Sequence, residues 1–116
     1  MGTQDPDERA AGRLEDAAQR AAARGAPDAA AQLAEHASRL TPTRWSPADC
    51  HRRLAASNYH ARAGNGPRAR ALLEELITHL PPGTTRAKAL AALACLVTDD
   101  SWDGLFVRAW PRPATI

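Results

Sequence analysis

Large apolar side chains are scarce in this chain of 116 residues. Leu, Ile, Val and Phe together supply 17 residues, about 15% of the chain, and aromatic residues make up only 4%. This composition argues against a strand-rich fold, because β-sheets are built mainly from β-branched and aromatic residues. The length allows one domain and excludes a two-domain enzyme of ordinary size.

The chain also has little net charge, no long apolar run and few cysteines. The net charge is only +2, and the basic residues are dispersed along the chain, which argues against disorder and against direct nucleic-acid binding. No apolar run approaches the roughly 18 residues of a membrane span, and the polar N-terminus does not resemble a signal peptide. Cys50 and Cys95 are therefore expected to be reduced thiols in a cytoplasmic protein that does not contact membranes.

Alanine is the most frequent residue, and most of the large apolar residues are leucine. Both are strong helix formers, and their helical spacing between prolines and glycines predicts five helices, over about 8–24, 28–40, 47–64, 69–80 and 84–97. Asp99, Asp100 and Ser101 could cap a short sixth helix. The stretch from Ala89 to Val97 is apolar on all sides and is expected to need neighbours on more than one face.

The sequence also contains an internal similarity between its two halves. When it is aligned with itself so that Pro27 falls on Pro67, Leu33 falls on Leu73. This self-similarity predicts an all-α fold of tandem antiparallel helical hairpins that form a superhelix like that of tetratricopeptide repeats. The expected organisation is a disordered N-terminus at 1–7 and a helical-repeat domain at 8–98. Residues 99–116 are expected to be a poorly packed tail or the start of an incomplete repeat.

Motifs that carry chemistry are not recognisable. Phosphate-binding glycine loops are missing, and Cys50, His51, His60 and Cys95 do not have the spacing of zinc ligands. We expect buried cysteines, exposed histidines, no enzymatic activity and no cofactor or metal.

A protein or peptide is the expected partner, and the oligomeric state stays open. The candidate residues for partner binding lie on the third predicted helix and in the C-terminal stretch: Arg52, Arg53, Tyr59, His60, Trp102 and Phe106. Arg52 and Arg53 also fit a solvated face that glutamates partly neutralise. Trp45, just before the third helix, is expected to act as a hydrophobic staple.

Three phrases between residues 23 and 96 are similar to a known family: ARGAPDAAAQLAEHASRLTP, RRLAASNYHARAGNGPRARALLEELITHLPPG and TRAKALAALACL. They resemble the helical-repeat region of large ATP-binding LuxR-type transcription regulators of the MalT-like group. In that family, tetratricopeptide-like repeats relay inducer or partner binding between an ATPase module and a DNA-binding helix-turn-helix. Gly64, Ala69 and Pro81 fit the tetratricopeptide pattern, whereas Ser57 and Leu76 depart from it.

Neither the ATPase motif nor the helix-turn-helix is present, so the resemblance assigns no ATP or DNA site. It implies a non-catalytic interaction or scaffold segment, a fragment of such a regulator. The alternative is a stand-alone adaptor that binds a peptide in the groove of a tetratricopeptide-like fold.

Overall fold

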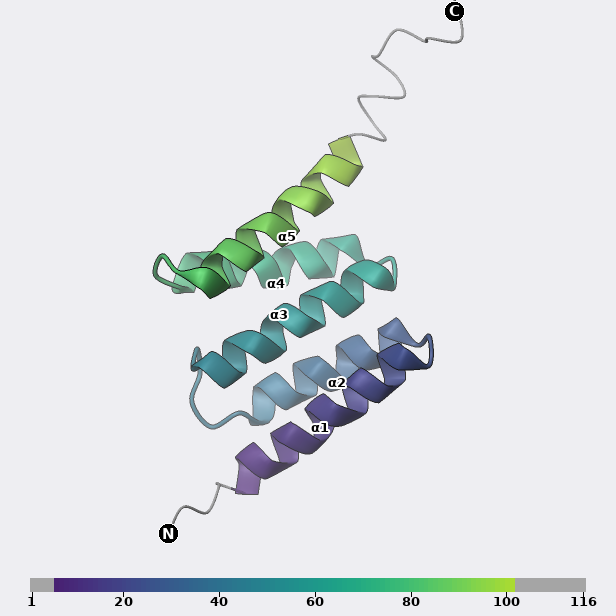
Figure 1. The fold of residues 1–116 in the computed structure, drawn as a ribbon, viewed down its shortest axis with the longest axis vertical. Coiled ribbons are helices and arrows are strands. Elements are labelled where there is room, and N and C mark those ends of the chain that lie inside the picture. The colour runs from purple at the N-terminus through teal and green to yellow at the C-terminus, as the bar shows by residue number, and fades with distance from the viewer. Residues whose placement is uncertain (1–5, 102–116) are drawn as a thin grey trace, which may run out of the picture.

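The computed structural model describes residues 6–101, and all of its regular structure is α-helical. The helices are α1 (Pro6–Ala23), α2 (Pro27–Leu40), α3 (Pro47–Arg62), α4 (Gly66–His79) and α5 (Thr84–Ser101). Consecutive helices pack against each other as antiparallel hairpins, with α1 and α5 at opposite ends of the stack (Figure 1). The predicted all-α fold of stacked hairpins is confirmed. Within residues 6–101 no helix is long and apolar enough to cross a membrane.

Both ends of the described chain differ from the expected boundaries. Helix α1 begins at Pro6, two residues before the expected helix start at 8. Helix α5 continues to Ser101, beyond its expected end at 97, so Asp99 does not start a new helix. Extending an existing helix by one residue costs far less than starting a new one, because the first turn fixes several residues for a single hydrogen bond. Residues 1–5 and 102–116 lie outside the described part of the chain.

The turns that close the first two hairpins have the same structure. Gly25 and Gly64 adopt φ values of 83° and 86°, which a residue without a Cβ tolerates best. The Ala26 amide donates to the Ala21 carbonyl at 2.9 Å, and the Asn65 amide donates to the His60 carbonyl at 2.8 Å. Gly25 and Gly64 therefore occupy equivalent positions in the turns of the first two hairpins.

The predicted alignment of Pro27 with Pro67 is wrong by one position. Pro27 is the first residue of α2, whereas Pro67 is the second residue of α4. Proline is tolerated at both positions, because the amides of the first helical turn have no partner within the helix. When Gly25 is aligned with Gly64 instead, the buried residues Ala34 and Ala37 align with the buried residues Leu73 and Leu76.

The left-handed turn predicts a selective effect of alanine substitution. Gly64→Ala is expected to lower the free energy of unfolding by about 1 kcal/mol, because Cβ disfavours a positive φ. Gly66→Ala is the control: its φ is not positive and its added Cβ meets no atom within 4 Å. Urea denaturation of both variants measures the difference. Equal unfolding midpoints would contradict a requirement for glycine in the turn.

The core consists of two clusters that differ in side-chain size. Alanine dominates the cluster between α1, α2, α3 and α4, where Leu72 of α4 is the one large buried residue. Leu73 and Leu76 form the centre of the second cluster, between α3, α4 and α5, with Cys50 and Ala89. Alanine lets helices approach closely but buries little apolar area. Polar contacts therefore have a larger share in holding α1 and α2 to α3.

The apolar stretch of α5 is only partly covered. Ala89 is fully buried, whereas Leu90 and Val97 are 42% and 38% exposed. Helix α5 packs mainly on α4 and to a smaller extent on α3. Ala92, Leu93 and Leu96 also pack against the cluster of α3 and α4 residues, so the expected need for neighbours on more than one face is partly met.

Candidate functional site

The first candidate residue, Arg52, is the centre of a buried ion cluster between α1 and α3. Its guanidinium binds Glu8 in bidentate geometry, with Nη1 and Nη2 donating at 3.0 and 2.7 Å. Its Nε donates to Glu15 at 2.9 Å, and Nη1 also donates to the Thr41 hydroxyl at 2.8 Å. Only 5% of the Arg52 side chain is exposed, and the pKa of Glu8 is lowered by the hydrogen bonds from Arg52. The interpretation of Arg52 as part of a solvated face is therefore wrong, and its part in partner binding stays a prediction.

Arg53 is held at the other side of α3 by a second buried carboxylate. Asp49 is 1% exposed and accepts hydrogen bonds from the Ser38 hydroxyl, the Trp45 amide and Arg53 Nε. The Arg53 guanidinium lies 4.1 Å from the centre of the Trp45 ring, and its Nη1 is 3.5 Å from Glu75. Arg53 thus joins α3 to α4 and is itself largely buried.

Trp45 fixes the entry into α3, as the sequence predicts for a hydrophobic staple. Its ring lies in the second core cluster together with Cys50, in the first turn of α3, and stacks on His79 with ring centres 4.2 Å apart. Its φ of 63° is a strained value for a bulky residue. Burial raises the pKa of the Cys50 thiol, which donates to the Trp45 carbonyl at 3.4 Å. Cys95, by contrast, is exposed, so the expectation of burial is wrong for it.

His60, expected to be exposed, is 8% exposed and belongs to a third cluster, at the contact of α2 with α3 and α4. Its Nε2 lies 2.5 Å from Glu35 Oε2, and the Asn65 amide nitrogen lies 3.5 Å from its Nδ1. Arg68 donates to both Glu35 oxygens, at 2.5 and 3.2 Å. Hydrogen bonds from Arg68, and to a smaller extent from His60, lower the pKa of Glu35.

The four predicted residues that the structure describes do not converge on one surface. Tyr59 is partly buried and packs on the alanine-rich cluster. Arg52, Arg53 and His60 form separate contacts between helices, and Trp102 and Phe106 lie outside the described residues. Within residues 6–101, no group of three or more His, Cys, Asp or Glu side chains is placed to hold a metal ion.

The lowered pKa values of Glu8 and Glu35 predict a loss of stability in acid. Both carboxylates gain cationic partners on folding, so their contribution is complete above about 4.5, the ordinary glutamate value, and is lost as the pH falls through their lower folded values. Urea unfolding at pH 7, 5, 4 and 3 measures this decline. The double variant Glu8→Gln/Glu35→Gln is expected to be less stable at pH 7 and to lose less stability between pH 5 and 3. An equal acid loss in both proteins would contradict the assignment.

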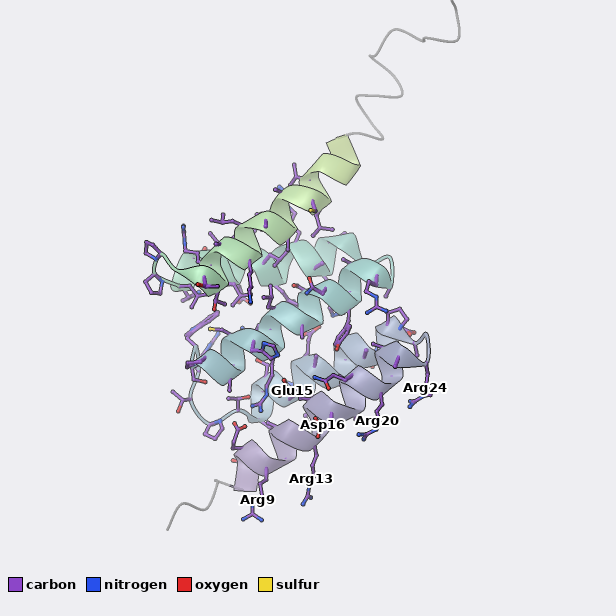
Figure 2. All side chains as sticks on the ribbon, in the orientation of Figure 1. Arg9, Arg13, Glu15, Asp16, Arg20 and Arg24 are labelled. Carbon is purple, nitrogen blue, oxygen red and sulfur yellow. The ribbon has the colours of Figure 1, made fainter. Side chains whose placement is uncertain are left out.

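A further charged surface, on α1, was not recognised in the sequence. Arg9, Arg13, Arg20 and Arg24 are all exposed. Figure 2 shows them extending from α1 and its end away from the other helices. The 3.6-residue periodicity of a helix places them on one side, a signal that the even mixture of acidic and basic residues in this segment obscured.

No model of a known protein family, no curated protein and no solved structure matches this chain.

Proposed function

We propose that the chain is a non-catalytic helical-repeat segment that acts as a protein-interaction scaffold. The observation that supports this most is the use of polar groups at the contacts between helices. Among the described residues, every buried side-chain nitrogen and oxygen has a hydrogen-bond partner within the chain. Arg52, Asp49 and Glu35 each join elements distant in sequence. Groups saturated in this way hold the hairpins in a fixed orientation.

The relation to LuxR-type regulators belongs to the same proposal. The similar phrases cover residues 23–96, which include α2, α3, α4 and most of α5. The matching turns at Gly25 and Gly64 support a tandem hairpin unit. The unit that separates these two glycines is longer than the usual tetratricopeptide length of about 34, and residues 41–46 between α2 and α3 account for part of the difference.

A stand-alone adaptor is the second candidate, but the geometry favours it less. Its peptide groove would use Arg52, Arg53, Tyr59 and His60, and Arg52 and His60 are buried with partners inside the chain. A partner would have to displace Glu8, Glu15 or Glu35 to reach them.

Two measurements test the proposal. The DNA that flanks the coding region is expected to encode a phosphate-binding ATPase motif upstream and a helix-turn-helix downstream; their absence would remove the relation to the regulators and favour the adaptor. Cross-linking in the source cells, followed by mass spectrometry, is expected to identify a protein partner. Turnover of a small molecule by the purified chain, without any cross-linked protein, would overturn the scaffold function itself.

A further inference from the structure

Helix α1 has a cationic face on which four arginines outnumber a single acidic residue. Arg9 and Arg13 form one pair at i and i+4, and Arg20 and Arg24 form another. At 3.6 residues per turn, all four lie within an arc of about 60°. None of their side chains makes a hydrogen bond or ion pair with any residue from 7 to 97. We call this surface the α1 arginine face (Figure 2).

The fold creates this face by separating the charges of a nearly balanced helix. Glu8 and Glu15 turn toward α3, where they bind the buried guanidinium of Arg52. Glu15 therefore cannot neutralise the arginines on the opposite side of its own helix. Asp16 is the one acidic residue on the arginine face, between the two pairs. The inward acidic residues make contacts within the fold, whereas the outward basic residues remain accessible to another molecule.

Gly12 lies about 60° outside the arc of the four arginines, one turn before Asp16, and has no function in the packing of this chain. A Cβ added to Gly12 would meet no atom within 4 Å, so neither a turn nor a close contact requires glycine there. A glycine in a helix interior costs about 1 kcal/mol relative to alanine. Glycine has no side chain, so it leaves a depression on the helix surface beside the long neighbouring side chains. The backbone of another molecule can approach the helix closely there.

We propose that the α1 arginine face docks an acidic α-helix of a partner protein. Guanidinium groups bind carboxylates with two parallel hydrogen bonds, which favours Arg over Lys for this contact. The centres of the two arginine pairs are about 16 Å apart, which corresponds to three helical turns. An antiparallel partner helix with carboxylates at i, i+4, i+11 and i+15 matches this spacing, and a basic residue at i+8 faces Asp16.

The position of Asp16 favours a helix over a nucleic acid or an anionic membrane. A line of phosphates would meet repulsion midway along the face, at the margin where Asp16 lies, whereas a protein helix can place a cation there. This inference rests on the proposed scaffold function and names the chemistry of one partner of that scaffold.

The test uses the full chain and a synthetic helical peptide with Glu at i, i+4, i+11 and i+15 and Lys at i+8. The control peptide has the same composition in scrambled order. Fluorescence anisotropy is expected to show binding of the first peptide that weakens with salt, and at least about 10-fold weaker binding of the scrambled one. Failure of the first peptide to bind, or equal affinity for both, would overturn the inference.

Substitutions locate the contact. Arg13→Glu/Arg20→Glu is expected to weaken peptide binding at least about 10-fold, whereas Arg39→Glu/Arg44→Glu, which changes two arginines elsewhere, is expected to leave it within about 2-fold. Gly12→Leu raises helix propensity but fills the depression, so it is expected to weaken binding without loss of helical circular dichroism. Unchanged affinity in Gly12→Leu and in the double Arg13/Arg20 variant would place the peptide elsewhere.

Competing ligands complete the test. Duplex DNA and phosphatidylserine vesicles are expected to bind more weakly than the designed peptide at the same salt concentration. If either ligand bound more tightly than the peptide and Arg13→Glu/Arg20→Glu abolished that binding, the inferred ligand would be a phosphate-bearing surface instead of an acidic helix. A cellular partner that still cross-links to the double variant would overturn this inference while leaving the scaffold function in place.

Discussion

Replacement of Arg52 by methionine is expected to lower the free energy of unfolding by about 3 kcal/mol. Methionine fills part of the space but leaves Glu8 and Glu15 without the guanidinium that binds both of them. Removal of one member of a buried ion cluster usually costs more than the cluster contributes, because the remaining charges stay poorly solvated. About a quarter of each glutamate side chain is exposed, so partial hydration keeps the effect at the lower end of the range for buried pairs. Urea denaturation at pH 7 measures it.

Three further variants serve as controls for the prediction at Arg52. Arg52→Lys keeps the charge but loses the bidentate geometry, so an intermediate loss is expected. Glu8→Gln/Glu15→Gln/Arg52→Met removes all three charges and is expected to recover part of the stability. Arg70→Met breaks the exposed pair with Glu74 and is expected to cost no more than about 0.5 kcal/mol. If Arg52→Met costs no more than Arg70→Met, the buried cluster does not hold α1 to α3.

The burial of Arg52 shows why local sequence patterns recover helices more readily than contacts between them. Proline and glycine act on the backbone within a turn, so Pro27, Pro47 and Gly64 predict helix ends from their own neighbourhood. The acidic partners of Arg52, by contrast, lie 37 and 44 residues earlier in the chain. No spacing near Arg52 indicates them, and two adjacent arginines resemble a solvated surface.

The repeat alignment was wrong by one position for a related reason. In an alanine-rich chain many shifts align small residues with small residues, and the prolines then decide the alignment. Proline fits either the first or the second position of a helix, so it locates a helix start only to within one residue. The pairing of Gly25 with Gly64 is more reliable, because a left-handed turn requires its glycine at one position.

The α1 arginine face could have been found partly from the sequence. The spacing of Arg9, Arg13, Arg20 and Arg24 places them on one side of any helix that contains them. The net charge of this side also depends on which side of α1 the acidic residues of the same helix face. Because Glu8 and Glu15 face inward and bind Arg52 of α3, the charge of the outward side is a property of the folded hairpins.

The second large effect is expected at Leu76, at the centre of the leucine-rich cluster. Leu76 is fully buried among Leu73, Cys50 and Ala89, and these residues join α4 to α3 and α5. Leu76→Ala is expected to cost about 3 kcal/mol, because it leaves a cavity in a cluster with few large side chains. Leu90→Ala, at a position 42% exposed, is expected to cost less than about 1 kcal/mol and serves as the control.

Because the core consists of two separate clusters, the loss of stability in Leu76→Ala is expected to differ between the two ends of the helix stack. Helix α5 has no ion pair to its neighbours among residues 84–97, so its position depends on the apolar contacts that Leu76 organises. Helix α1 is held by the ion cluster of Arg52, far from the new cavity. Hydrogen exchange in Leu76→Ala is therefore expected to accelerate in α5 more than in α1, and in Arg52→Met more in α1 than in α5. Equal acceleration throughout in both variants would mean that the hairpins unfold as one cooperative unit.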